Sequence, residues 1–218
     1  NSGADLLNLI NEILDLSKVE SGKMELDVAE IPFAEINTDI TAMFSEVAKN
    51  KSIDFSIQFN ERALKNIIIT DKQRLEQILR NLLSNAFKFT GKGGKVTFSI
   101  DKASSEIVFK NPNLNTITDI IAFSVTDTGI GIPEDKLGIV FEAFQQADGS
   151  TKRKYGGTGL GLSISRELAN ALGGEIHLHS KEGKGSTFTL YLPLKFDTSI
   201  MAPFERKIEL KEKKKEYP

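Results

Sequence analysis

Four short stretches that contain glycine, amide or charged residues follow one another between Asn81 and Leu162. In order, they read Asn81-Leu-Leu-Ser-Asn-Ala-Phe-Lys88, Asp127-Thr-Gly-Ile-Gly131, Phe141-Glu-Ala-Phe144 and Gly156-Gly-Thr-Gly-Leu-Gly-Leu162. Each stretch alone is a weak signal, because amide pairs and glycine turns occur in many proteins. Their order within one short region, however, limits strongly what the chain can fold into.

Length and composition indicate one globular domain with an appendage, since the chain has 218 residues and 39% hydrophobic residues. The net charge of −2 does not indicate the basic surface that nucleic-acid-binding proteins carry. The absence of cysteine excludes disulfides and thiolate chemistry and fits a cytoplasmic location. No apolar run reaches the roughly 18 residues of a membrane span, although the full-length protein could be membrane-anchored. The chain begins at Asn1 without an initiator Met, so we expect a fragment.

The first 22 residues predict a helix with a broad apolar face. Between Asp5 and Ser21, apolar residues recur at the spacing of a helix, and Ser21-Gly22 ends the pattern. An ordinary core helix and a helix of a larger bundle both fit this pattern.

The following region, residues 23–195, alternates between strand and helix patterns. An α/β two-layer sandwich is predicted, with helices on one face of a mixed sheet. Strands are expected near 24–28, 53–59, 67–69, 96–100, 120–126, 175–180 and 186–194, and helices near 32–49, 71–87 and 159–172. The polar stretch 102–119 reads as a loop or hairpin that could contain a short strand at 107–109. Residues 196–218 are rich in charge and are interpreted as a solvated linker.

In this order, the four stretches resemble the N box, first glycine box, F box and second glycine box of sensor histidine kinases. The ATP-binding catalytic domain of those kinases shares a superfamily with gyrase B, a heat-shock chaperone and a mismatch-repair ATPase. The resemblance extends from about Asp5 to Leu194 and implies a Bergerat-type ATP-binding fold. It also makes residues 1–22 similar to the second helix of a kinase dimerisation bundle, and the stretch Thr151–Gly157 similar to those of hybrid kinases.

Asn81 and Asn85 lie four residues apart, so both carboxamides would face one side of a helix. Spacing alone leaves open whether this is simply an exposed pair. The resemblance implies that Asn85 is a ligand of the Mg²⁺ that bridges the ATP phosphates, and Lys88 could reach a phosphate as a point charge. In the hydrolases of the superfamily, a water-activating Glu stands where this chain has Asn81. An amide cannot act as a general base, so we expect the site to hold ATP for another nucleophile.

Asp127 follows a buried strand pattern and precedes Gly129 and Gly131. The pattern also occurs in plain turns. The resemblance implies that Asp127 accepts a hydrogen bond from the adenine amine and that the two glycines let the backbone approach the nucleotide. By the same resemblance, Thr187 matches a polar residue near the adenine.

The F box and the second glycine box flank a stretch, residues 145–157, that resembles an ATP lid. By the same resemblance, Phe141 and Phe144 would anchor this lid, and a plain core role is compatible with that role. Many relatives carry Arg where this chain has Gln146, so Arg153 is our candidate for the cation that contacts phosphate. The glycine box would open a helix whose free N–H groups attract the phosphates, and its residues are Gly157, Thr158, Gly159, Leu160, Gly161 and Leu162.

The two histidines, His177 and His179, lie two residues apart on a predicted strand and are interpreted as ordinary strand residues. Neither lies in a phosphoacceptor context. The expected function is therefore transfer of the ATP γ-phosphoryl to a His outside this chain. The expected partners are a His-bearing dimerisation domain and a response-regulator receiver domain, with no nucleic acid and a homodimeric full-length protein. The alternatives are an ATP-hydrolysing clamp and a nucleotide-binding regulatory or scaffold module.

Overall fold

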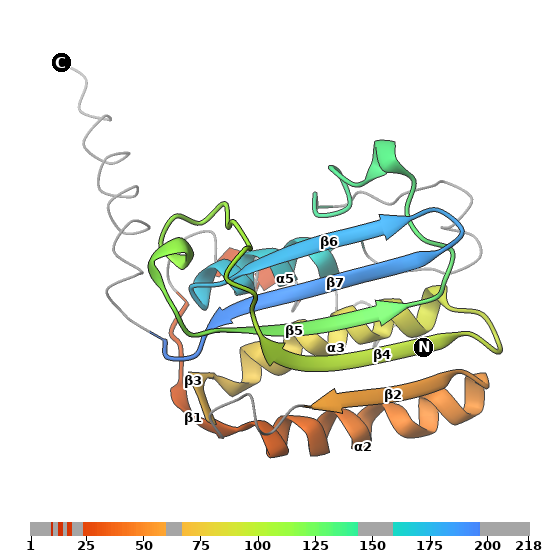
Figure 1. Ribbon diagram of the computed structural model, residues 1–218, viewed down its shortest axis with the longest axis horizontal. Coiled ribbons are helices and arrows are strands. Elements are labelled where there is room, and N and C mark those ends of the chain that lie inside the picture. Colours follow the sequence, from red (N-terminus) through yellow and green to blue (C-terminus); the bar gives the residue numbers. More distant parts are fainter. Residues whose placement is uncertain are drawn as a thin grey trace.

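A five-stranded mixed sheet forms one layer of the computed structural model (Figure 1), which describes residues 10, 13–14, 17–18, 24–59, 67–143 and 159–196. Its strands follow the order β2-β4-β5-β7-β6. Only β2 and β4 run parallel, and the other neighbours are antiparallel. The bounds are β2 (Asp54–Phe59), β4 (Lys95–Lys102), β5 (Ile120–Asp127), β6 (Glu175–Lys181) and β7 (Gly185–Pro193).

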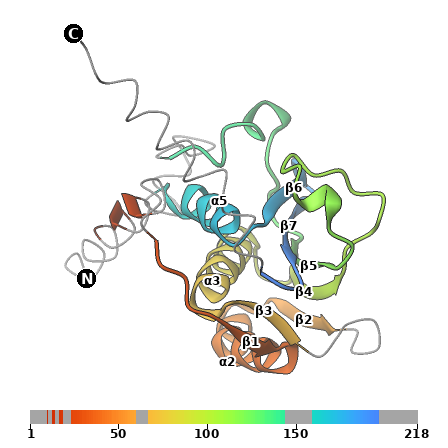
Figure 2. The same cartoon turned by 90° about the vertical axis from the view of Figure 1, so that its left-hand side faces the viewer.

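Three helices lie along one face of this sheet, as Figure 2 shows, and form the second layer. They are α2 (Phe33–Lys51), α3 (Lys72–Phe89) and α5 (Gly161–Ala171). A second, two-stranded sheet pairs β1 (Val28–Pro32) with β3 (Ile67–Asp71), and two short 3₁₀ helices are present at η1 (Leu114–Thr116) and η2 (Glu134–Lys136). The predicted two-layer α/β sandwich with a mixed sheet is confirmed.

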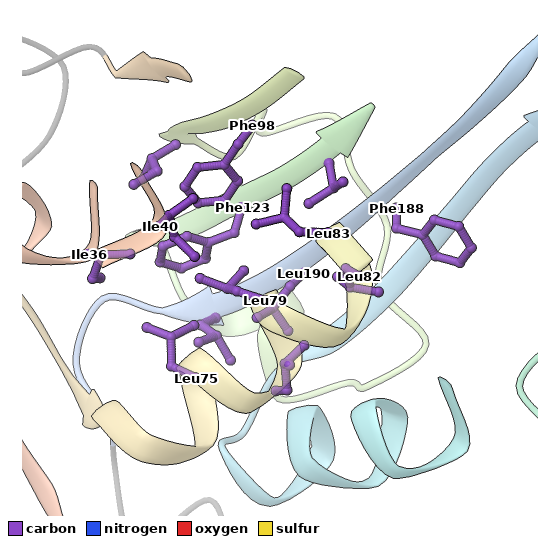
Figure 3. Close-up of a cluster of buried hydrophobic side chains, with 14 of the residues drawn as sticks. Ile36, Ile40, Leu75, Leu79, Leu82, Leu83, Phe98, Phe123, Phe188 and Leu190 are labelled. Carbon is purple, nitrogen blue, oxygen red and sulfur yellow. The ribbon is translucent and has the colours of Figure 1, made fainter. Parts of the chain in front are cut away.

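The core lies between the helices and the inner face of the sheet, which is the face that the helices cover. Side chains alternate along each strand, so Phe98, Phe123 and Leu190 point to the same side and meet the apolar face of α3 (Figure 3). From α3, four leucines are completely buried in this layer: Leu75, Leu79, Leu82 and Leu83. Burial of such a continuous apolar surface is the main force that holds the helices on the sheet.

The outer face of the sheet is polar and carries hydroxyl pairs across its strands. Ser124 and Thr189 are joined at 3.0 Å between their hydroxyl oxygens, and Thr126 and Thr187 are joined at the same distance. One end of this face is covered by the connection between β4 and β5, which packs a small apolar cluster against Tyr191.

The prediction that residues 107–109 could form a short strand was wrong, because these residues belong to an irregular loop. The side chain of Asn115 accepts from the Phe109 N–H and donates to the Phe109 carbonyl, at 2.9 Å in each case. The carboxylate of Glu175 accepts the N–H groups of Lys110 and Asn111. Side chains therefore satisfy the backbone groups that a strand neighbour would otherwise take.

The boundaries near the N-terminus also differ from expectation. The strand expected at 24–28 is β1, which begins at Val28, and Pro32 is the residue before α2 rather than its first residue. Of the first 22 residues, Ile10, Ile13 and Leu14 have helical backbone and are each about half exposed. Ser17 and Lys18 also have helical backbone, and the remaining residues of that predicted helix, together with those of the predicted linker beyond Phe196, lie outside the described residues. None of the helices in the described ranges combines the length and apolar character that a bilayer crossing requires.

We expect Asp71→Ala to lower the free energy of unfolding by about 1–3 kcal/mol, because this buried carboxylate serves two segments. One oxygen accepts the N–H of Arg74 at 3.0 Å and caps α3, and the other accepts the N–H of Asp27 at 2.9 Å. Urea denaturation measures the change. Asp71→Asn is the matched control and should lose less stability than Asp71→Ala, because its amide oxygen still caps the helix. Equal stability of Asp71→Ala and the unchanged protein would contradict this role.

Candidate functional site

A row of polar side chains ends the apolar inner face of the sheet. Along this face the cross-strand partners are Leu178, Phe188 and Val125 in one row, and Ser180, Ser186 and Asp127 in the next. Asp127 is the last residue of β5 and is only 7% exposed. One oxygen of its carboxylate accepts the N–H of Gly129 at 2.8 Å. The sheet thus presents a buried carboxylate at one end of the core.

The surroundings of Asp127 raise the pKa of its carboxyl above the ordinary value of 3.8. Burial is the main cause, and the N–H groups of Gly129 and Ser186 offset part of it. The two N–H groups offset only part of the cost of burying the ionised carboxylate, so a further N–H donor would stabilise it. Asp127 is therefore suited to accept a hydrogen bond from a ligand.

The backbone after Asp127 forms a tight loop, residues 129–132, between the end of α3 and the β6–β7 turn. A Cβ on Gly129 would lie 2.5 Å from the carbonyl oxygen of Phe89. A Cβ on Gly131, which has φ +67°, would lie 2.1 Å from the carbonyl oxygen of Lys181. Both positions therefore require glycine, for close approach and, at Gly131, for the left-handed backbone.

Asn81 joins α3 to α5. Its amide nitrogen donates to the hydroxyl of Ser165 at 2.8 Å, and Ser165 is buried on α5. A Cβ on Gly161 would lie 2.4 Å from the amide oxygen of Asn81. The structure therefore excludes an exposed, unengaged Asn81 and shows why the first residue of α5 is glycine.

Asn85 and Lys88 follow Asn81 along α3, and both are half-buried. No hydrogen bond joins the Asn85 carboxamide to another residue in the described ranges. Burial lowers the pKa of the Lys88 ammonium from its ordinary value, and its Nζ lies 5.0 Å from the centroid of the Phe89 ring. The carbonyl of Phe89 borders Gly129, so the polar end of α3 and the glycine loop belong to one region.

The start of α5 completes the region. Gly159 has φ +74°, Leu160 is fully buried, and α5 begins at Gly161. The hydroxyl of Ser163 donates to the Leu160 carbonyl at 2.8 Å, and Leu162 packs partly against the core. The first N–H groups of a helix have no acceptor within the helix, and the helix dipole favours an anion near them. Four predicted site residues lie outside the described residues, namely Phe144, Arg153, Gly157 and Thr158.

The structure does not bring Thr187 together with Asp127. Thr187 faces Thr126 on the outer side of the sheet, whereas Ser186 is the cross-strand partner of Asp127 on the inner side. The alternation of apolar residues along β7, with Phe188, Leu190 and Leu192 facing inward, could have identified Ser186 as the inward residue.

The histidines behave as strand residues. His177 Nε2 lies 2.6 Å from the carboxylate of Glu175, and its ring packs on Phe109 and Tyr191. In the part of the chain that the structure describes, no three His, Asp or Glu residues gather as a metal site would need.

We expect Gly161→Ala to lower the free energy of unfolding by about 1–3 kcal/mol, because its methyl group would meet the Asn81 carboxamide. Adding Asn81→Ala should relieve this contact, so the double variant should be more stable than the sum of the single effects implies. Gly138→Ala is the control, since a Cβ there meets nothing within 4 Å. If the effects of the two substitutions on the free energy of unfolding simply add in urea denaturation, the contact between residue 161 and Asn81 is not the cause of the loss.

Comparison with known proteins agrees with this geometry. The family described as "Histidine kinase-, DNA gyrase B-, and HSP90-like ATPase" matches residues 70–196, more than half of the chain. The circadian input-output histidine kinase CikA of Synechococcus elongatus is 39% identical over 207 residues, which are 94% of this chain and 25% of CikA. The autoinducer 2 sensor kinase/phosphatase LuxQ of Vibrio vulnificus is 41% identical over 89% of this chain and 22% of LuxQ. The chain thus spans about a quarter of the length of these relatives.

Solved structures show the same fold. Full-length ShkA in complex with AMPPNP superposes with a TM-score of 0.70 and 30% identity, over 88% of this chain and 36% of ShkA. The catalytic domain of histidine kinase ThkA, in a nucleotide-free form, gives a TM-score of 0.60 and 25% identity, over 78% of this chain and 97% of that domain. From the matched family, the kinase relatives and this shared fold, we conclude that the chain belongs to the histidine kinase-, DNA gyrase B- and HSP90-like ATPase family, as the ATP-binding domain of a two-component sensor kinase.

Proposed function

We propose that this chain binds Mg²⁺-ATP and transfers its γ-phosphoryl to a histidine outside residues 1–218. The observation that carries the proposal is the buried Asp127 carboxylate, which lies at the end of β5 beneath a glycine loop that borders the polar end of α3. A buried carboxylate can select a ligand that offers an N–H group. The amides of α3 and the start of α5 then offer groups suited to phosphates and their metal.

In this proposal, Asp127 accepts a hydrogen bond from the exocyclic amine of adenine, and Gly129 and Gly131 let the base approach the backbone. Hydrogen bonds to an ionised acceptor are stronger than neutral ones, so Asp127 provides much of the selectivity for the base. Ser186, rather than Thr187, is the polar residue of β7 that neighbours Asp127.

The residues of α3 and α5 fit a magnesium triphosphate. Mg²⁺ commonly takes one or two protein oxygens and completes its shell with phosphate oxygens and water. The carboxamide oxygen of Asn85 suits this use. Lys88 supplies positive charge, and the first N–H groups of α5 attract phosphate oxygens. Among the residues of the predicted lid, Arg153 remains our candidate for a further cation.

Asn81 supports transfer to another nucleophile rather than hydrolysis. Its amide nitrogen is engaged with Ser165, and a carboxamide cannot take a proton from water at neutral pH. Catalysis then consists of holding ATP in position and neutralising charge while the histidine attacks.

The proposed kinase function also implies which partners the chain has. The half-exposed apolar residues Ile10, Ile13 and Leu14 support a helix that packs in a dimerisation bundle with the acceptor histidine, within a homodimeric full-length protein. A receiver domain is the expected next acceptor. In support, one relative is named hybrid signal transduction histidine kinase D, from Dictyostelium discoideum, with 39% identity over 87% of this chain and 12% of its own length.

We expect Asp127→Asn to weaken ATP binding about ten- to hundredfold, since it replaces a charged acceptor by a neutral one. The fold should tolerate the change. A raised pKa means that ionised Asp127 costs stability, and this cost grows as pH rises from the ordinary value of 3.8 through the raised pKa. At pH 7 the amide removes that cost, so the free energy of unfolding should stay equal or increase.

Calorimetry and urea denaturation test both parts. In the unchanged protein, ATP affinity should be constant at neutral pH and should decrease as pH falls through the raised pKa, because protonation removes the acceptor. Asp127→Asn should lack this pH dependence. Unchanged affinity in the variant would contradict the role of Asp127 in binding the base.

The function itself is tested by transfer in trans. The chain should bind ATP without labelling itself, and a separately supplied dimerisation domain with an acceptor histidine should become labelled from γ-labelled ATP. The product should be acid-labile, as a phosphoramidate is. Label on His177 or His179, or rapid phosphate release without the acceptor domain, would contradict the proposal.

A further inference from the structure

The hydroxyl of Ser180 lies at the junction of three segments. Ser180 is near the end of the edge strand β6, and it lies in the same inner-face row as Ser186 and Asp127. Its oxygen accepts the N–H of Ile132 at 2.8 Å, lies 3.0 Å from the carbonyl oxygen of Gly185 and lies 2.9 Å from the hydroxyl of Ser186. One side chain therefore contacts the glycine loop, the β6–β7 turn and the residue beside Asp127.

These contacts use the whole capacity of the hydroxyl. A serine hydroxyl has one proton to donate and two lone pairs. The carbonyl of Gly185 can only accept, so the proton of Ser180 goes there, and the hydroxyl of Ser186 donates to Ser180 together with the Ile132 N–H. No other side chain in the described ranges donates to, or accepts from, the backbone of Ile132.

The glycine loop and the turn are interlocked around this hydroxyl, at the right-hand end of the sheet in Figure 1. The N–H of Gly183 donates to the carbonyl of Ile130 at 2.7 Å, and Gly131 abuts the Lys181 carbonyl. A Cβ on Gly185 would lie 1.9 Å from the carbonyl oxygen of Asp127. The β6–β7 turn is therefore the support against which the glycine loop and the backbone of Asp127 are held.

We propose that Ser180 is a positioning residue for base recognition, which holds the glycine loop against the β6–β7 turn and so sets the place of the Asp127 carboxylate. Ser180 acts through Ile132 and Ser186 and does not itself touch the nucleotide. This inference rests on the proposed function, in which Asp127 accepts from the adenine amine. Its consequence is that losing the Ser180 hydroxyl weakens the part of binding that depends on the base and spares the part that depends on the phosphates.

The first test measures the hydrogen bond without any nucleotide. Amide hydrogen exchange should be slow at Ile132 in the unchanged protein and clearly faster in Ser180→Ala. Ser124→Ala is the matched control, because its hydroxyl also pairs across strands, with Thr189 at 3.0 Å, but on the outer face of the sheet. Equal exchange at Ile132 in Ser180→Ala and Ser124→Ala would overturn the proposal.

The second test compares the affinities for ATP and GTP by calorimetry. GTP carries the same triphosphate but no exocyclic amine at the corresponding position. Ser180→Ala should lower the ratio of ATP to GTP affinity about tenfold, as loss of one hydrogen bond implies, and Ser124→Ala should leave it unchanged. A general loss of stability would not change this ratio. If Ser180→Ala does not fold, Ser180→Cys, with a weaker donor and acceptor, should lower the ratio in the same direction.

A double variant separates this proposal from the proposed function. If Ser180 acts through Asp127, then Ser180→Ala should have no further effect on the ratio in the Asp127→Asn background. A further decrease there would overturn the positioning role. An unchanged protein that does not prefer ATP over GTP would contradict the role of Asp127 in the proposed function. A ratio of ATP to GTP affinity that Ser180→Ala leaves unchanged would contradict the role of Ser180 alone.

Discussion

The packing of α3 on the inner face of the sheet is the contact on which the rest of the structure depends. Its leucines are completely buried against β4, β5 and β7, so the rotation of the helix about its axis is determined by the core. The same rotation places Asn81 toward α5, where its amide meets Ser165. Because side chains three and four residues apart lie on one side of a helix, Asn85 and Lys88 follow from the same orientation. Burial of leucine thus positions the polar groups proposed to serve ATP.

The polar row at the end of the inner face shows how the sheet changes from core to site within one step along its strands. Phe188 and Val125 occupy one row, and Ser186 and Asp127 occupy the next. The apolar row removes water from one side of the carboxylate, and the glycine loop encloses it from another. Burial therefore raises the pKa of Asp127 while its backbone partners keep the carboxylate oriented. Desolvation gives this acceptor its strength toward a ligand donor.

The two faces of the sheet have different tasks. The inner face carries the core and the polar row, whereas the outer face carries hydroxyl pairs such as Ser124 with Thr189. On the outer face, the carboxylate of Glu175 holds the loop between β4 and β5 through two backbone N–H groups, and it also lies 2.6 Å from His177 Nε2. This loop covers apolar residues that the helices do not reach. The site proposed to bind the nucleotide therefore lies on the side of the helices, and both histidines lie on the other side.

Periodic patterns in the sequence determined the elements and their class, because apolar alternation and helical spacing reflect which faces are buried. The three helices and the mixed sheet were predictable in this way, whereas Asp127 and its two glycines were singled out by the resemblance to sensor histidine kinases. Only the tertiary structure decided what lies across from each residue. It showed that Asn81 bonds Ser165, that Ser186 rather than Thr187 neighbours Asp127, and that side chains replace a strand neighbour at 107–109. The physical reason is that each of these facts depends on a contact between segments distant in sequence, whose register and approach are set by packing and leave no local pattern.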